Sequence, residues 1–156
     1  MTGAGGTLLV INAGSSSIKF QLFEVTPPDG LRLAFRGQLE GIGSKPHLSA
    51  KDATGAILTD EAFSPGEVAD VSAALDRIEG WLLGRLVSAP RAIGHRVVHG
   101  GPDFDAPILV DDAVLERLER LVPLAPLHQP NNLAPIREIR ARRPDMPQVA
   151  CFDTSL

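Results

Sequence analysis

The stretch from Thr7 to Val25, TLLVINAGSSSIKFQLFEV, constrains the fold more than any other part of the chain. It opens with an apolar run over residues 8–11, which is typical of a short buried strand. The run breaks at residues 12–17, NAGSSS, and residues 18–25 then alternate apolar with polar side chains. Two such runs joined by a few Gly- and Ser-type residues predict a β-hairpin.

The tip of this hairpin carries an unusual set of polar groups. Asn12 offers an amide, Ser15 and Ser17 offer hydroxyls, and Lys19 follows two residues later. Together with backbone N–H groups of a turn, these groups suit phosphate oxygens. The alternative is a solvated serine-rich turn without a ligand, which is the more frequent reading for an arbitrary hairpin.

Length and composition exclude several classes of protein. The 156 residues suit one domain that buries roughly 70% of its unfolded surface. The net charge of −4 gives no electrostatic reason to expect nucleic acid or an anionic membrane as a partner. A single cysteine, Cys151, excludes an internal disulfide, and no P-loop signature occurs. With no leader and no membrane-length apolar run, we expect a soluble cytoplasmic protein.

The middle of the chain predicts further strands and a helix. Residues 31–43 alternate as a third strand, antiparallel to the second, and residues 47–63 predict an exposed hairpin at an edge. The segment Ser64-Pro65-Gly66-Glu67 carries helix-start signals, and apolar residues from Val68 to Leu86 follow at helical spacing. We therefore expect one amphipathic helix that begins near residue 64.

The segment RAIGHRVVHGG, residues 91–101, predicts a strand with an arginine on one face. Gly94, Arg96 and Val98 share that face, which would form a small pocket with a cationic and an apolar wall, suited to a short carboxylate. The alternative for Arg96 is a structural ion pair. His95 and His99 would lie ~13 Å apart on a strand, which rules out a zinc pair.

Two more candidates lie near the end of the chain. His128 lies in a loop whose prolines fix its direction, although a plain surface histidine is an equal alternative. Asn131 or Asn132 is expected to cap the helix that follows. Asp153 ends the buried strand QVACF, where open α/β sheets place their chemistry. A single visible carboxylate does not by itself predict a metal.

Four segments, NAGSSSIKF, GHRVVHGG, PLHQPNN and FDTSL, occur in this order along the chain. Together they resemble the motifs of the acetate kinase family, which includes acetate and propionate kinases. Gln129-Pro130-Asn131 departs from the family's Asn-Pro-Pro. The resemblance implies an α/β fold of the ribonuclease H-like, actin-like ATPase kind. It further implies a mixed sheet whose antiparallel N-terminal strands are flanked by helices.

The same resemblance implies roles for individual residues. Arg96 would hold acetate and offset developing charge, and His128 would donate a hydrogen bond to the transferring phosphoryl group. Val98 and Leu127 would line the methyl pocket, with Val98 favouring acetate over propionate. The residues implied to hold ATP phosphates are Asn12, Ser15, Ser17 and Lys19. Asn12 and Asp153 would lie at the Mg²⁺ or Mn²⁺ ion.

The implied reaction is ATP plus acetate giving acetyl phosphate plus ADP, in either direction. Residues 1–156 would form the N-terminal lobe, with the C-terminal lobe absent from this chain, and this piece alone would be inactive. The full-length enzyme would be a homodimer. Two alternatives stay open: a propionate kinase, and a non-catalytic nucleotide-binding or interaction domain with the same fold.

Overall fold

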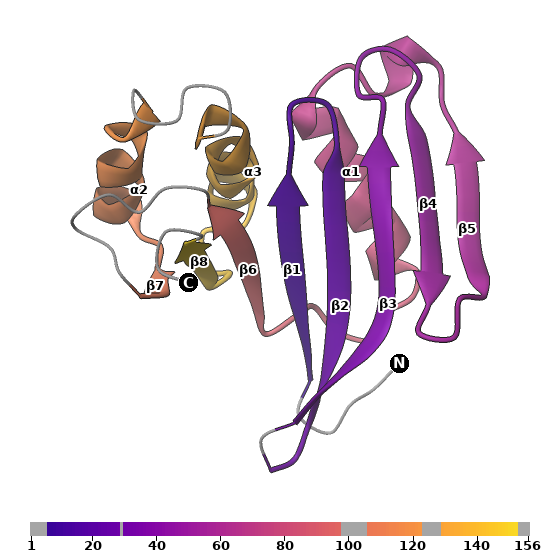
Figure 1. Ribbon diagram of the computed structural model, residues 1–156, viewed down its shortest axis with the longest axis horizontal. Coiled ribbons are helices and arrows are strands. Elements are labelled where there is room, and N and C mark those ends of the chain that lie inside the picture. Colours follow the sequence, from indigo (N-terminus) through magenta and orange to yellow (C-terminus); the bar gives the residue numbers. More distant parts are fainter. Residues whose placement is uncertain (1–5, 29, 98–105, 123–128, 153–156) are drawn as a thin grey trace.

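The computed structural model describes residues 6–28, 30–97, 106–122 and 129–152. These residues form a mixed eight-stranded sheet in the order β5-β4-β3-β2-β1-β6-β8-β7. In Figure 1 the sheet faces the viewer and α1 is drawn behind β2, β3 and β4. Strand β6 pairs in parallel with β1 and β8, and the other neighbours are antiparallel. The predicted fold class is confirmed.

The strands are β1 (Thr7–Ala13), β2 (Ile18–Thr26), β3 (Gly30–Glu40), β4 (His47–Asp52), β5 (Ile57–Ala62), β6 (Ala92–Val97), β7 (Ile108–Leu109) and β8 (Gln148–Phe152). The helices are the 3₁₀ turn η1 (Pro65–Glu67), α1 (Val71–Leu83), α2 (Asp112–Glu119) and α3 (Gln129–Arg142). In the part of the chain that the structure describes, none of the helices has the length and apolar character needed to cross a membrane.

Alternation along the strands explains how the sheet packs. On β1 and β2, every second side chain is buried beneath the helices, including Ile11, Phe20 and Leu22. Trp81 of α1 packs on this layer, with its ring centroid 6.0 Å from that of Phe20 and 5.1 Å from that of Phe35. The predicted hairpin and third strand are confirmed, with β2 pairing antiparallel to both β1 and β3.

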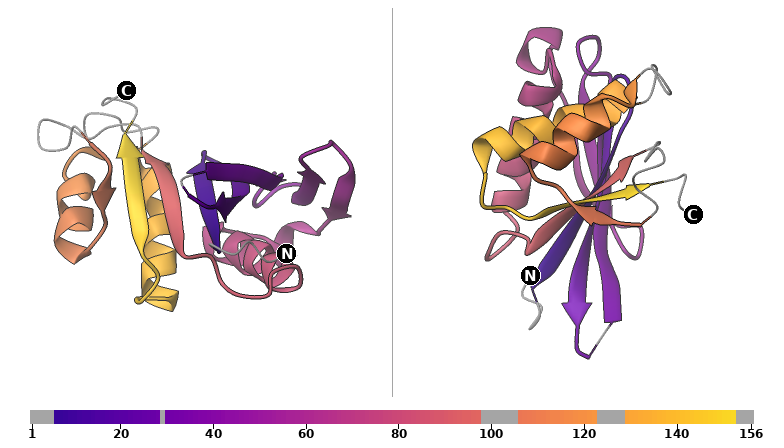
Figure 2. Two further views of the ribbon diagram at one scale, coloured as in Figure 1. Left: turned by 90° about the horizontal axis from the view of Figure 1, so that it is seen from below. Right: turned by 90° about the vertical axis from the view of Figure 1, so that its left-hand side faces the viewer.

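A second apolar cluster covers the other half of the sheet. Val97 of β6 and Phe152 of β8 are buried against side chains of α2 and α3, among them Leu118 and Ile136. Figure 2 shows these helices beside β6 and β8, and α1 beside the N-terminal strands. Because both clusters lie on one face, the opposite face of β1–β4, β6 and β8 is free of described helices. We call this the open face.

The helix expected from residue 64 begins later. Ser64 starts only the 3₁₀ turn η1, which has a capping box with Glu67. Val68 then leaves helical geometry, with φ −137° and ψ 72°, and its side chain is fully buried. Asp70 provides a second N-cap, because its carboxylate accepts a hydrogen bond of 2.8 Å from the N–H of Ala73. The regular helix therefore runs only over Val71–Leu83.

Two further expectations need correction. Helix α3 begins at Gln129, so neither Asn131 nor Asn132 is its cap, and Pro135 lies inside the helix. The hairpin of β4 and β5 is only partly an exposed edge. Strand β5 is the edge of the sheet, but Leu48 and Ala50 of β4 are buried in the core.

Candidate functional site

Three candidate side chains share the open face of the sheet. Asn12 near the end of β1 is directly opposite Lys19 on β2. In the parallel pair of β1 and β6, Ile11 is opposite His95, so Asn12 and Arg96 each come one residue later on adjacent strands. Alternation therefore turns Asn12, Lys19 and Arg96 to the same face, at the carboxyl ends of β1 and β6.

The serine turn between β1 and β2 has a defined backbone. The N–H of Gly14 donates a hydrogen bond of 2.9 Å to the carbonyl oxygen of Ser17. The N–H of Ile42, just after β3, donates to the carbonyl oxygen of Ser16 at 3.0 Å. These bonds fix the turn, while Ser15 is exposed and Ser17 half-buried. Hydroxyl and amide donors beside the Lys19 ammonium can bind an anion.

Helix α3 holds the end of β1 in place. The buried side chain of Asn132 donates a hydrogen bond of 3.0 Å to the carbonyl oxygen of Ala13. The sequence contained no signal for this contact, since the two residues are 119 positions apart. The contact ties the first turn of α3 to the residue that opens the serine turn.

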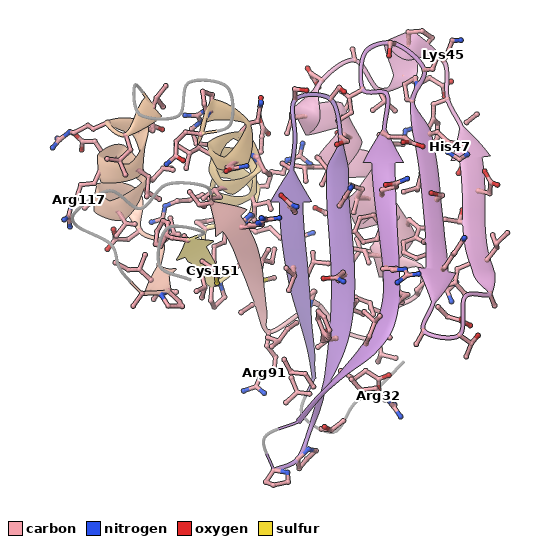
Figure 3. The ribbon with its side chains drawn as sticks, viewed as in Figure 1. Arg32, Lys45, His47, Arg91, Arg117 and Cys151 are labelled. Atoms are coloured by element: carbon pink, nitrogen blue, oxygen red, sulfur yellow. The ribbon has the colours of Figure 1, made fainter. Side chains whose placement is uncertain are left out.

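Arg96 and His95 lie on opposite faces of β6, as predicted. Arg96 is exposed and pairs in register with Cys151 of β8, a free and exposed thiol that Figure 3 labels. His95 is buried, and its Nε2 lies 2.6 Å from Oε1 of Gln148. Burial, opposed by the Gln148 hydrogen bond, lowers the pKa of His95 to about 4. His95 is therefore neutral at pH 7, and it packs on the buried face of β6.

A hollow of about 490 Å³ lies over β1, β2, β3 and β4. Asn12 and Lys19 are part of its lining. Of the residues expected to form a short-carboxylate pocket over β6, Val98 lies outside the described residues. Gly94 and Arg96 do share the open face, but a Cβ at Gly94 would meet a methyl group of Val10 at an ordinary 3.9 Å. The space beside Arg96 therefore does not require glycine.

Four predicted site residues, Val98, Leu127, His128 and Asp153, lie outside the described residues. Within the described ranges, no three His, Cys, Asp or Glu side chains gather in a group that could hold a metal. A magnesium ion usually takes one or two carboxylates plus substrate phosphates, so its site needs no such cluster. The side-chain oxygen of Asn12, in the lining of the hollow, is of the oxygen type that Mg²⁺ binds, although it is not a carboxylate.

Solved structures of kinases share this fold. The propionate kinase of Francisella tularensis subsp. tularensis SCHU S4 and the acetate kinase of Porphyromonas gingivalis each superpose with a TM-score of 0.84 and 30% identity. Each match covers 96% of this chain, and 37% and 38% respectively of the solved chain. The chain thus has the actin-like ATPase fold of these small-carboxylate kinases.

The sequence narrows this class to one family. Residues 7–156 match the acetokinase family. Acetate kinases of Nitrobacter hamburgensis and Rhizobium meliloti are 54% identical over 149 residues and 51% identical over 148 residues, which is 96% and 95% of this chain. The chain belongs to the acetokinase family. It spans 37% of the length of each of these two relatives.

Proposed function

We propose that this chain is part of an acetate kinase, which transfers the γ-phosphoryl group of ATP to acetate and gives acetyl phosphate and ADP. The observation that carries the proposal is the strand register that brings Asn12, Lys19 and Arg96 to one face. In a member of the acetokinase family, these are the groups that phosphate and carboxylate oxygens require.

In this proposal the protein acts by positioning and by stabilising charge, as phosphoryl transfer generally requires. The Arg96 guanidinium binds the acetate carboxylate and offsets negative charge on the phosphoryl group in flight. Lys19 and the serine turn hold the phosphates of ATP so that the acetate oxygen attacks in line. Asn12 lies between these groups, opposite Lys19.

The proposal extends to residues outside the described ranges. We assign His128 a hydrogen bond to the phosphoryl group, and Val98 and Leu127 the methyl pocket. The contact of Asn132 with Ala13 supports the assignment of His128, because it holds the helix that follows beside the serine turn. The pairing of Cys151 with Arg96 supports a site role for Asp153 two residues later.

A divalent ion, Mg²⁺ or Mn²⁺, is expected to accompany ATP, with Asn12 and Asp153 as its protein ligands. Such an ion would supply charge neutralisation between the phosphates. We further propose that residues 1–156 form the N-terminal lobe of a homodimeric, cytoplasmic enzyme. The match to 37% of the relatives' length supports the lobe assignment, and in this proposal the remaining length supplies the rest of the nucleotide site.

Acetate is the favoured acid. The relatives at 54% and 51% identity are acetate kinases, and this likeness supports acetate. One additional methylene changes the transition-state free energy by only ~1–3 kcal/mol in such a pocket. Activity with propionate at a lower kcat/KM is therefore expected, and comparing kcat/KM for the two acids tests the preference.

The reaction can be tested in a chimera that joins residues 1–156 to the remaining length of the Nitrobacter hamburgensis acetate kinase. Acetyl phosphate is trapped as the hydroxamate. We expect turnover, and we expect Arg96→Ala to lower kcat/KM by about 10²- to 10³-fold. The control is Arg91→Ala, an exposed arginine just before the same strand, labelled in Figure 3.

A chimera that folds and binds ATP but forms no hydroxamate would contradict the proposal. So would equal activities of the Arg96→Ala and Arg91→Ala chimeras. The first result would favour a non-catalytic nucleotide-binding or interaction domain, and the second would remove Arg96 from the proposed site.

A further inference from the structure

Two cations face each other on the open face without a counter-charge. Arg36 on β3 is directly opposite Lys51 on β4, and both side chains are exposed. Like charges directly opposite each other destabilise an antiparallel pair. Among residues 6–28, 30–97, 106–122 and 129–152, neither side chain has a hydrogen-bond or ion-pair partner.

The neighbouring carboxylates are already engaged. On the same edge of the sheet, His47 contacts the carboxylates of both Asp60 and Glu40. Asp52, next to Lys51 in sequence, turns its carboxylate into the β4–β5 turn, where it accepts hydrogen bonds from Thr54. Among the described residues, Arg36 and Lys51 therefore have no carboxylate partner, and their charges are available to an anion from solution.

The hollow of about 490 Å³ lies over this pair and provides further donors. Lys19 adds a third cation, two strands away from Lys51. The neutral hydrogen-bonding side chains in the lining are Asn12, Gln21, Gln38 and Ser49. Its volume lies within the range of about 300–1,000 Å³ that small-molecule sites occupy.

We propose that this hollow holds a second anion site, which binds an oligophosphate through Arg36 and Lys51 and adjoins the phosphate groups assigned to Asn12 and Lys19. An oligophosphate carries several charged oxygens close together, which matches three cations and four neutral polar side chains across four strands. A single carboxylate from a protein segment offers two oxygens and would leave most of these groups unbound. The proposal goes beyond the kinase reaction, because neither Arg36 nor Lys51 has a role in it.

Binding can be measured on the 156-residue chain by calorimetric titration with sodium tripolyphosphate at low ionic strength. The double variant Arg36→Gln/Lys51→Gln is expected to weaken binding by about tenfold or more, because hydrogen bonds to charged groups are stronger than those between neutral groups. The matched control is Lys45→Gln. Lys45 is exposed in the loop before β4, where Figure 3 labels it, and it is not among the residues that line the hollow. This variant is expected to bind as the wild type does.

A second measurement does not depend on the ligand. Without anion and at low salt, Arg36→Gln alone should raise the thermal unfolding midpoint, because it removes the repulsion with Lys51. The gain should disappear in high salt, where exposed charges are screened. A lower midpoint for Arg36→Gln at both salt concentrations would show a structural role and overturn the inference.

Three binding outcomes would also overturn it. The first is no tripolyphosphate binding at all, and the second is unchanged affinity in the double variant. The third is binding that Lys19→Gln abolishes and the double variant leaves intact, which would place the anion at the serine turn. If a poly-glutamate peptide binds through Arg36 and Lys51 while tripolyphosphate does not, the face recognises an acidic protein.

The experiments distinguish a failure of the oligophosphate site from a failure of the proposed kinase function. In the chimera, Arg36→Gln/Lys51→Gln is expected to keep basal hydroxamate formation in the absence of tripolyphosphate. Loss of kinase activity through Arg96→Ala should leave tripolyphosphate binding to the isolated chain unchanged. An Arg96→Ala chain that no longer binds tripolyphosphate would contradict a separate second site.

Discussion

The amide of Asn132 donates a hydrogen bond of 3.0 Å to the carbonyl oxygen of Ala13, and so joins the first turn of α3 to the end of β1. Both residues are buried. The bond is the direct link between the serine turn and the helix that follows the proline-rich loop. It gives the candidate site a rigid side.

We expect Asn132→Ala to destabilise the fold by about 1–3 kcal/mol, because the buried carbonyl of Ala13 loses its donor. Urea denaturation measures the change. Gln21→Thr is the control, since Gln21 is an exposed strand amide without a hydrogen-bond partner among the described residues, and Thr suits a strand. Equal stabilities of the two variants would show that the Asn132 bond contributes nothing.

His95 should make stability depend on pH. Its pKa falls from 6.5 to about 4 on folding, so between these values the unfolded chain binds more protons than the folded one. Stability is then fully present above about pH 7 and decreases as pH falls toward 4. The expected loss from this residue is about 2 kcal/mol between pH 7 and pH 5.

Chemical denaturation at both pH values checks this loss. His95→Gln should remove it, whereas His47→Gln, at an exposed pair with Asp60, should not. If His95→Gln and the wild type show the same difference between pH 7 and pH 5, the buried neutral imidazole is the wrong explanation.

Arg142 joins α3 to α1. Its guanidinium donates to the carbonyl oxygen of Ser72 at 2.8 Å and to its hydroxyl at 2.7 Å, and also contacts Asp76. We expect Arg142→Ala to cost about 1–3 kcal/mol of unfolding free energy. Arg120→Ala, which removes an exposed pair with Glu116, should cost less than about 0.5 kcal/mol. In thermal unfolding, Arg142→Ala should therefore have a clearly lower midpoint than Arg120→Ala.

Gly37 permits the close packing of Phe20 beneath β3. A Cβ at this position would lie 2.5 Å from the Phe20 ring and 2.7 Å from the carbonyl oxygen of Ser49. Gly37→Ala should therefore destabilise the sheet. Gly80→Ala, at an exposed helical position with open space, should instead stabilise by about 0.5–1 kcal/mol. Chemical denaturation should therefore give a lower free energy of unfolding for Gly37→Ala than for the wild type, and a higher one for Gly80→Ala.

The sequence predicts the features that depend on local alternation. The hairpin of β1 and β2, the face of Arg96 and the strand that ends near Asp153 follow from burial every second residue. The start of α1 does not, because Ser64 and Asp70 are both good N-caps and the sequence does not rank them. Val68 decides between them by packing into the core instead of continuing a helix.

Contacts between distant residues could not be predicted in the same way. The bond of Asn132 to Ala13 and that of Gln148 to His95 depend on how α3 and β8 dock on the sheet. The facing pair of Arg36 and Lys51 depends on the register of β3 and β4. The sequence gives no signal for any of these contacts, since only the tertiary arrangement gives each residue its partner or neighbour.

We propose that Lys19 and Arg96 serve one transition state, Lys19 at the ATP phosphates and Arg96 at the acetate and the phosphoryl group in flight. A double-mutant cycle in the chimera, with Lys19→Ala, Arg96→Ala and the pair, tests this claim most directly through kcat/KM. Groups that share one ligand are expected to couple by about 0.5–3 kcal/mol, so the double variant should lose less than the two single losses combined. Strict additivity of the two losses would show that the residues serve separate sites and would contradict the account.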